Sequence, residues 1–311
     1  NLKEYFPIKT GMLKTTPLKA VADVSFAIRK GETLGLVGES GCGKTTVGRT
    51  LLHLYKPTAG EVWFKGKKIE TKADILEYRK KSAMVFQDPY SSLSPRLTVG
   101  QLLSEGVRAH GIVPGKLTAD YVAEVLQRCG LQASHADRFP HEFSGGQRQR
   151  IAIARALALK PRFVVCDEAV SALDVAVQGK IVALLQQLQE AENLSYLFIS
   201  HDLSVVKYIS DDIAVMYLGN IVEMGSAKEI CTNAKHPYTQ ALFSAVPVAN
   251  PHAKSEPLAL EGELPSPANP PKGCKFHTRC KYCTDQCREE APPMKDIGNG
   301  HYVSCHLCDQ L

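Results

Sequence analysis

The sequence predicts an α/β fold in which helices pack on a central sheet. Residues 33–37, 163–166 and 195–200 are short apolar runs of strand length, and apolar residues with helical spacing follow the first two of them. With 311 residues the chain is long enough for one large domain and a small second one. We therefore expect a large α/β domain with a small C-terminal extension.

The composition is that of an ordinary folded protein, with 44% hydrophobic and 22% charged residues. No run approaches the roughly 18 consecutive apolar residues of a membrane span, and the first residues contain no apolar signal core. These features predict a chain that is neither secreted nor membrane-spanning. The net charge of +5 permits a nucleotide, a nucleic acid or an acidic membrane as partner and selects none of them.

The first predicted strand leads into GESGCGKTT (38–46), which fits the pattern G-x-x-x-x-G-K-S/T. Glycines in this pattern let backbone N–H groups surround phosphate oxygens, while Lys44 reaches the β- and γ-phosphates and the Thr45 hydroxyl binds Mg²⁺. A glycine-rich turn without a ligand is the alternative interpretation. The candidate nucleotide-binding residues of this loop are Gly38, Ser40, Gly41, Cys42, Gly43, Lys44, Thr45 and Thr46.

A helix is predicted from Lys44 onward, because Val47, Leu51 and Leu54 recur at helical spacing and would share one face. The positive end of this helix would point at the phosphates that the loop surrounds.

The second predicted strand, 163–166, ends in Asp167 and Glu168. A carboxylate at the carboxyl end of a strand beside a phosphate loop can hold Mg²⁺, and the next carboxylate can polarise an attacking water. By itself an acidic pair after an apolar run is weak evidence, since surface residues at a strand end have the same pattern.

The segment FSGGQRQRIAIARALALKP (143–161) lies just upstream. Ser144 and two glycines open a predicted helix that stops before Pro161, and a serine and glycines at a helix start form a second anion site. One chain cannot easily bring two such sites onto one γ-phosphate. We therefore expect a head-to-tail pair of ATPase domains, each of which completes the site of the other.

These residues resemble the nucleotide-binding subunits of ABC transporters over residues 1–233. The 38–46 loop is similar to Walker A, FVVCDE to Walker B, and FSGGQ to the signature LSGGQ, with Phe143 in place of Leu. Gln87 in MVFQDP resembles the Q-loop glutamine, SALD (171–174) the D-loop, and His201 in LFISHD the switch histidine.

The resemblance implies a role for each matching residue. Glu168 would be the general base, and Gln87 and His201 would position the γ-phosphate. Thr45, Gln87 and Asp167 would surround Mg²⁺. The residues expected to contact the ATP of the partner are Ser144, Gly145, Gly146, Gln147 and Asp174.

The sequence departs from the family at Ala169, where the family usually has proline. This residue lies beside the catalytic residues and takes no part in the reaction, so we expect the ATPase site to be active. The adenine should stack on an aromatic residue before the first core strand, for which Phe6 is the first candidate and Tyr5 the second.

Residues from about 95 to 145 carry no strand signals and predict a helical subdomain that ends in the signature. Residues 175–191 predict a helix on the sheet, with one apolar stripe made of Val177, Ile181, Leu184, Leu185 and Leu188. We expect residues 1–233 to form the ATPase domain and residues 234–311 the extension.

The segments FQDPYSSLSPRLTVGQ (86–101) and AKHPYTQALFSAVP (234–247) narrow the resemblance to the dipeptide, oligopeptide and nickel importers. The Pro-rich residues 247–273 predict an extended strap rather than a domain. The resemblance implies an ATPase subunit on the cytoplasmic face of a bacterial or archaeal membrane. Its partners would be a paralogous ATPase subunit, two transmembrane permease subunits and an extracytoplasmic peptide-binding protein, with no nucleic acid.

Other functions remain open at this point. A nickel or other-solute importer of the same family fits the same motifs. A ribosome-associated or assembly-associated ABC ATPase is the alternative class, although an iron–sulfur protein of that kind should carry two ATPase cores and N-terminal cysteines. A DNA-repair relative needs a long coiled coil, for which the 122 residues between Lys44 and Asp167 leave no room.

Six of the ten cysteines fall in the last 38 residues. Without an export signal such a cluster favours metal binding over disulfides. Two close pairs, Cys280 with Cys283 and Cys305 with Cys308, would suit zinc. The looser set that suits a 4Fe–4S cluster, and that the importer resemblance favours, is Cys274, Cys280, Cys287 and Cys305. We expect the remaining cysteines, Cys42, Cys129, Cys166 and Cys231, to be structural.

Overall fold

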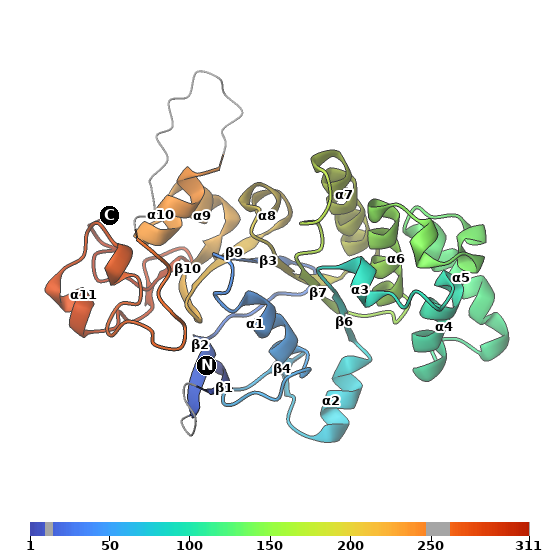
Figure 1. Cartoon of the computed structure of the whole chain (residues 1–311), viewed down its shortest axis with the longest axis horizontal. Helices are drawn as coiled ribbons and strands as arrows, with labels where there is room; N and C mark the ends of the chain where they lie inside the picture. Colours follow the sequence, from blue (N-terminus) through green and yellow to red (C-terminus); the bar gives the residue numbers. More distant parts are fainter. Residues whose placement is uncertain (10–14, 247–261, 311) are drawn as a thin grey trace, which may run out of the picture. The chain divides into compact units, whose positions relative to one another are not determined.

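The computed structural model describes residues 1–9, 15–246 and 262–310. The part of the predicted Pro-rich strap up to residue 261 lies outside the described residues. The chain divides into two compact units. The first combines Asn1–Ala27, Leu34–Val62 and Ser200–Leu311, and the second combines Ile28–Thr33 and Trp63–Ile199. Figure 1 labels the elements of both and colours the chain from its N-terminus to its C-terminus.

The first unit contains a mixed sheet. Its strands, in spatial order, are β1 (Leu2–Lys9), β2 (Thr15–Val24), β10 (Asn220–Ser226), β9 (Asp212–Tyr217) and β3 (Thr33–Val37). The pairs β1–β2 and β9–β10 are antiparallel, whereas β3 runs parallel to β9, with Leu34 opposite Asp212. Every residue of β3 is buried. A continuous apolar strand of this kind is covered on both faces, which confirms the strand predicted at 33–37.

A two-residue turn joins β9 to β10. Tyr217 lies opposite Asn220, and the residues between them, Leu218 and Gly219, have positive φ angles of 41° and 79°. Positive φ at both central residues is the geometry of the tightest hairpin turns. The turn also contacts β2, because the Gly219 oxygen accepts a hydrogen bond of 2.8 Å from the Ala22 N–H.

Helix α1 (Lys44–Leu51) begins at the predicted residue and buries Val47. The prediction that Leu54 shares its apolar face is wrong. The helix ends at Leu51, His53 adopts a φ of +53° that turns the chain, and the Leu54 side chain is 48% exposed. The other helices of this unit are α8 (Leu203–Ile209), α9 (Ala227–Thr232), α10 (Pro237–Ser244) and α11 (Asp285–Glu289), with a 3₁₀ turn at His277–Arg279.

The end of the chain returns to the sheet. Strand β12 (Tyr302–Val303) pairs antiparallel with β10, with Val303 opposite Glu223, and strand β11 (Lys295–Asp296) pairs with β12. The C-terminal residues therefore belong to the same compact unit as the phosphate-loop motif.

The second unit contains three parallel strands in the order β8 (Ser195–Ile199), β7 (Phe163–Asp167) and β6 (Ser82–Val85). The predicted strands 163–166 and 195–200 are confirmed to within one residue at their ends. All residues of β7 are buried, which explains the unbroken apolar run over 163–166. Because the strands are parallel, their carboxyl ends meet at one edge of the sheet.

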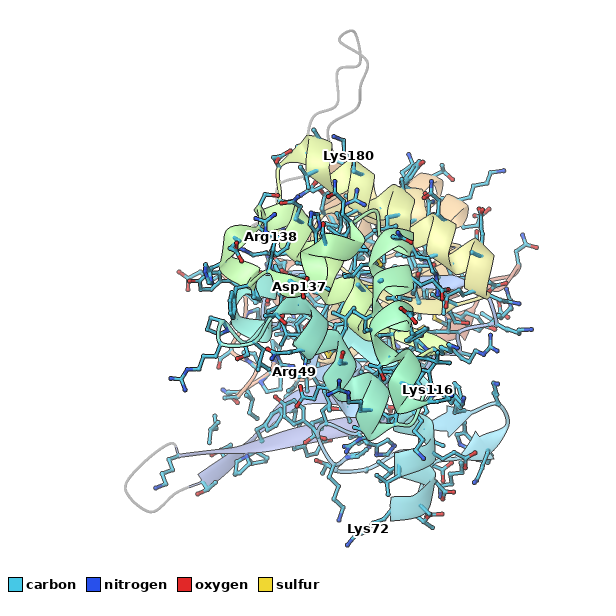
Figure 2. All side chains as sticks on the ribbon, turned by 90° about the vertical axis from the view of Figure 1, so that its right-hand side faces the viewer. Arg49, Lys72, Lys116, Asp137, Arg138 and Lys180 are labelled. Carbon is cyan, nitrogen blue, oxygen red and sulfur yellow. The ribbon has the colours of Figure 1, made fainter. Side chains whose placement is uncertain are left out.

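The connection from β6 to β7 is long and helical. Between β6 and β7 the regular elements of the described chain are helical: α3 (Pro89–Ser92), α4 (Val99–Ala109), α5 (Thr118–Arg128), α6 (Gly145–Leu157) and 3₁₀ turns at Gly115–Leu117, Ala133–Asp137 and Pro140–Glu142. Helices α4, α5 and α6 pack on one another (Figure 1). Figure 2 labels Asp137 and Arg138 in the segment that joins α5 to α6. The Arg138 carbonyl accepts a hydrogen bond of 2.9 Å from the Val99 N–H at the start of α4.

The remaining elements of this unit are β4 (Trp63–Phe64), β5 (Lys67–Lys68), α2 (Lys72–Arg79) and α7 (Val175–Glu192). Helix α7 covers the predicted segment 175–191 and buries Ile181, Leu184, Leu185 and Leu188, while Val177 is half-buried. No helix among the described residues is both long enough and apolar enough to span a membrane.

Candidate functional site

The phosphate-loop motif forms a tight loop between β3 and α1. Lys44 is buried and turns back over this loop, and its Nζ donates to the carbonyls of Gly38 at 2.7 Å and Glu39 at 3.0 Å. No side chain caps α1 at Gly43, so no capping side chain competes with a ligand for the start of this helix. A glycine-rich loop that leads into such a helix start and carries a buried lysine is suited to a polyphosphate.

Two glycines of the loop are required by close approach of the backbone. A Cβ on Gly43, whose φ is +107°, would lie 2.1 Å from the Ala20 carbonyl oxygen. A Cβ on Gly38 would lie 2.2 Å from the Met216 carbonyl oxygen. Strands β2 and β9 thus press against the loop and fix its course.

The loop is also held from the C-terminal extension. The Tyr238 hydroxyl on α10 accepts the Glu39 N–H at 2.9 Å. The Arg279 guanidinium donates to both oxygens of the Glu39 carboxylate, at 2.7 and 3.0 Å. Neither residue was recognised from the sequence, because 240 positions separate Arg279 from Glu39 and no local pattern links them.

Both candidate adenine partners lie on β1 and are half-buried. The Phe6 ring packs edge-on against Tyr55, with centroids 5.3 Å apart. The Lys19 ammonium lies 5.9 Å from the centroid of the Tyr5 ring. The choice between them stays a prediction.

The acidic pair and the Q-loop glutamine meet within the second unit. Glu168 directly follows β7, Gln87 follows β6 by two residues, and Gln87 Nε2 donates to Glu168 Oε2 at 2.8 Å. Glu168 adopts a φ of +47°, which is uncommon for a residue with a side chain. Its N–H donates to the Ile199 carbonyl and its carbonyl accepts from Ser171. Asp167, the last residue of β7, is 1% exposed.

The signature segment starts α6 as predicted. Ser144 is the N-cap, and its Oγ accepts the Gln147 N–H at 3.4 Å while Gln147 Oε1 accepts the Ser144 N–H at 3.1 Å. This reciprocal capping fixes the direction in which the helix start points. Asp174 of the D-loop similarly caps α7 through the Val177 N–H at 3.0 Å. A Cβ on Gly146 would lie 2.6 Å from Val177 Cγ1, so these two helix starts are closely packed.

Phe143, which departs from the family leucine, is 3% exposed. Its ring lies edge-on to His135 at 5.2 Å and 4.6 Å from the Arg138 guanidinium. The phenylalanine is therefore packed in place of the family leucine, and its contacts with His135 and Arg138 hold the chain just before Ser144.

Two arginines of α6 connect the signature helix to the segment after Gln87. Arg155 donates to the Ser92 carbonyl at the end of α3 over 2.9 Å. The Arg148 guanidinium lies 5.2 Å from the centroid of the Tyr90 ring and donates to the Pro140 carbonyl. Tyr90 is 67% exposed, so this connection lies at the surface.

His201 follows β8 by two residues and is exposed. The next residue, Asp202, caps α8 by accepting the Ser204 N–H at 2.9 Å, and its own N–H donates to Ser200 Oγ at 3.0 Å. These bonds hold the chain on both sides of the histidine.

The ten cysteines are all free thiols. Cys42, Cys129 and Cys166 are buried, as expected of structural cysteines, and Cys231 is half-buried. In the extension, the Cys274 N–H donates to the Cys287 carbonyl at 2.8 Å.

Several thiols of the extension lie near enough to one another for their charges to interact. Burial, and to a smaller degree repulsion from Cys287, Cys305 and Cys280, raises the pKa of Cys274 to about 11. Burial together with Cys280, Cys308 and Cys287 raises the pKa of Cys305 to about 11. Within the described parts of the chain, no three His, Cys, Asp or Glu side chains are gathered closely enough to bind a metal ion.

Two families match the chain in the regions just described. The ABC transporter family matches residues 21–171. The family described as oligopeptide/dipeptide transporter, C-terminal region, matches residues 222–287.

Named relatives extend over nearly the whole chain. The oligopeptide transport ATP-binding protein AppF of Bacillus subtilis (strain 168) is 52% identical over 314 residues, covering 99% of this chain and 95% of that protein. The dipeptide transport ATP-binding protein DppF of Haemophilus influenzae is 48% identical over 314 residues, with the same coverage of 99% and 95%.

Solved structures agree on the fold. CbiO1 from Clostridium perfringens, part of the ABC transporter complex cbiONQ, gives a TM-score of 0.64 at 26% identity, covering 75% of this chain and 90% of that one. An ATP-binding cassette in a post-hydrolysis dimer bound to ADP and phosphate gives 0.63 at 29% identity, covering 73% and 97%. The fold and the motifs define an ABC ATPase. The chain belongs to the ATP-binding subunits of ABC transporters that carry the oligopeptide/dipeptide transporter C-terminal region.

Proposed function

We propose that this ATPase powers the uptake of dipeptides or oligopeptides across the cytoplasmic membrane. The observation that carries the proposal is the 52% identity with an oligopeptide transport subunit over 99% of the chain, which includes the extension as well as the ATPase motifs. The match of residues 222–287 to the C-terminal region of oligopeptide/dipeptide transporters supports the same cargo class.

Within this function we assign the ATP chemistry to the residues singled out by the motifs. Lys44, Thr45 and Thr46 hold phosphates and Mg²⁺, and Asp167 supports the metal. Glu168 acts as general base on the attacking water, while Gln87 and His201 position the γ-phosphate. The hydrogen bond from Gln87 to Glu168 supports this assignment, because it orients the carboxylate at the strand edge where the water is expected.

The remaining contacts come from a second ATPase subunit. The ATP of the partner is contacted by the signature and the D-loop, namely Ser144, Gly145, Gly146, Gln147 and Asp174. The capping bonds of Ser144 and Asp174 support this, since they orient two helix starts that pack against each other. Phe6 stacks on the adenine.

The proposed assembly contains a paralogous ATPase subunit, two transmembrane permease subunits and an extracytoplasmic peptide-binding protein, and no nucleic acid. The chain would lie peripherally on the cytoplasmic face of the membrane. In this arrangement residues 1–233 form the ATPase domain, with a helical subdomain over about 95–145, and residues 234–311 form the extension.

We assign a 4Fe–4S cluster to Cys274, Cys280, Cys287 and Cys305. Thiolates are the ligands that such clusters require. The hydrogen bond of 2.8 Å from the Cys274 N–H to the Cys287 carbonyl supports the assignment, because it brings two of these four residues together. Bound there, the cluster would supply structural cross-links among segments of the extension.

The test is reconstitution of the full transporter in lipid nanodiscs with its binding protein. The expected result is ATP hydrolysis that rises when the binding protein carries a di- or oligopeptide and that stays at its basal rate with the empty binding protein. Stimulation by a nickel chelate and not by peptides would overturn the cargo assignment. Failure of the chain to assemble with any permease would overturn the transport function.

A further inference from the structure

An ion pair joins the C-terminal extension to the phosphate-binding loop. Arg279 donates through Nη1 and Nη2 to the two oxygens of Glu39, at 2.7 and 3.0 Å. The Arg279 side chain is 5% exposed and the Glu39 side chain 27%. A forked contact of this kind fixes orientation as well as distance, which a single hydrogen bond does not.

A cluster of buried aromatic side chains lies next to Arg279 in the sequence and in the fold. Phe276, three residues before Arg279, is 2% exposed and packs against Tyr217 at 5.4 Å and Tyr238 at 5.4 Å between ring centroids. Tyr238 in turn accepts the Glu39 N–H at 2.9 Å. The backbone and the side chain of Glu39 are therefore both fixed by residues of the extension.

A second connection reaches the other side of the loop. Lys275 donates to the Leu218 carbonyl at 2.7 Å and also contacts the Asn220 side-chain oxygen. Between these two residues, the Gly219 N–H donates to the Cys42 carbonyl at 3.0 Å. The extension thus supports the loop near its beginning and, through the β9–β10 turn, near its middle.

We propose that Arg279 is a positioning residue of the nucleotide site, which holds the phosphate-binding loop through Glu39 and neutralises the Glu39 carboxylate beside the bound polyphosphate. The proposal rests on the assignment of the 38–46 loop to the ATP phosphates. Arg279 acts through Glu39 and does not itself touch the nucleotide. The C-terminal extension, which matches the oligopeptide/dipeptide transporter family, would then contribute a residue that positions the ATP-binding loop.

The physical reason is charge as well as geometry. Glu39 is an acidic residue in a loop that must receive three phosphates, and like charges at close range repel. The Arg279 guanidinium satisfies both carboxylate oxygens and removes this repulsion. Loss of a hydrogen-bonded partner of a charged group weakens an interaction by roughly 10-fold or more, which sets the scale of the expected effect on ATP affinity.

The experiment measures the dissociation constant of Mg-ATP, with a fluorescent ATP analogue, for the purified full-length chain. We expect Arg279→Gln to weaken binding of Mg-ATP about 10-fold. The affinity of Arg279→Lys should lie between that of Arg279→Gln and wild type, because lysine keeps the positive charge but cannot bond both carboxylate oxygens in the forked geometry. Adding Glu39→Gln to Arg279→Gln should restore most of the lost affinity, since the uncompensated carboxylate is then gone. The matched control is Arg288→Gln, an exposed arginine of the same extension.

The rescue separates positioning from a general role in folding. If Arg279→Gln only loosened the extension, the second substitution at Glu39 would not restore affinity, and the proposal would be wrong. An unchanged dissociation constant for Arg279→Gln would overturn it as well. Should Arg279→Gln fail to fold, Tyr238→Phe removes only the acceptor of the Glu39 N–H and is expected to weaken binding severalfold; unchanged binding would then count against the proposal.

Two further readouts distinguish this inference from the function it rests on. Lys44→Ala must abolish ATP binding if the loop holds the phosphates; wild-type affinity in that variant overturns the loop assignment itself. In the assembled transporter, Arg279→Lys should raise the KM for ATP and leave kcat within about twofold, because the arginine does not take part in the chemical step. A fall in kcat at unchanged KM would contradict a positioning role.

Discussion

Gln87 Nε2 donates a hydrogen bond of 2.8 Å to Glu168 Oε2. The two residues follow the carboxyl ends of the neighbouring parallel strands β6 and β7. The carboxylate assigned as the base is thus oriented by the glutamine of the Q-loop. Glu168 also has a positive φ of 47°, a conformation that its backbone bonds to Ile199 and Ser171 maintain. Strain held in place at one residue of a site is typical of residues that act in catalysis.

Substitution of the base should stop the chemistry and keep the binding. We expect Glu168→Gln to lower ATP hydrolysis by about 10²-fold or more, because the amide cannot accept a proton from water. The variant should accumulate as an ATP-bound dimer, which size-exclusion chromatography with bound-nucleotide analysis detects. Hydrolysis at the wild-type rate would remove Glu168 from the role of base.

Loss of the glutamine should have a milder effect of the same kind. Gln87→Ala removes the hydrogen bond to Glu168, so we expect kcat to fall about 10-fold while the dissociation constant of ATP changes little. Steady-state kinetics and equilibrium binding measure the two quantities separately. The control is Gln132→Ala, an exposed glutamine in the segment between α5 and α6. Equal losses in the two variants would contradict the prediction.

A methyl group on Gly43 should displace the phosphate-binding loop. Gly43→Ala places a Cβ 2.1 Å from the Ala20 carbonyl oxygen at a φ of +107°, so backbone must move. We expect ATP affinity to fall about 10-fold or more. Gly66→Ala is the matched control, because Gly66 has a φ of +75° with nothing within 4 Å of the added carbon. An ATP affinity in Gly43→Ala equal to that of the control would show that the contact is relieved without cost.

Acid should destabilise the protein through His236. This histidine is 1% exposed, and its Nδ1 accepts the Tyr238 N–H at 3.1 Å. Burial lowers the pKa of His236 from 6.5 to about 4, although the Glu223 carboxylate opposes the shift. Since the unfolded chain binds the proton more readily, stability is complete above about pH 6.5 and is lost as the pH falls toward 4.

The size of this loss can be measured by difference. Between pH 7 and pH 5 the histidine should cost about 2 kcal/mol in the free energy of unfolding. His236→Asn keeps a capping oxygen and has no proton to bind in this range, so its stability should fall less over the same interval. Denaturant titrations of both proteins at the two pH values give the comparison, and parallel losses would contradict the assignment to His236.

The cysteine set can be separated by single substitutions. Changing Cys274, Cys280, Cys287 or Cys305 to serine should reduce iron well below the expected ~4 atoms per chain in protein purified without oxygen. Cys283→Ser and Cys308→Ser are the matched controls and should keep the iron and the visible absorption. One zinc per chain that is lost on changing Cys283 or Cys308 would instead favour the paired set.

The core strands were predictable because burial leaves a local signature. Strands β3, β7 and β8 are continuous apolar runs, and each is bounded by a motif whose chemistry marks the strand end. The start of α6 was predictable for a similar reason, since Ser144 and Gln147 form a capping box within four residues. Leu54 was misassigned because helical spacing continues past the point where His53 turns the chain.

Contacts between distant segments left no such signature. The pair of Arg279 and Glu39 depends on how the extension folds back within the first unit, and either residue alone resembles an ordinary surface charge. Burial of Arg279 is what distinguishes it, since arginine is seldom buried without a partner, and burial is visible only in the folded chain. The bond between Gln87 and Glu168 likewise follows from the order of β6 and β7 in the sheet.

Glu223 limits where this chain can be shortened. Its fully buried carboxyl group on β10 accepts hydrogen bonds from the N–H groups of Lys235 and His236 and contacts His301 Nε2 at 2.7 Å. A chain cut before His301 would lose that imidazole and also β12, which pairs with β10. Proteolytic removal of His301 and the residues after it would therefore leave the buried Glu223 carboxyl group without one of its partners and would expose the edge of β10. We expect these two changes together to favour aggregation.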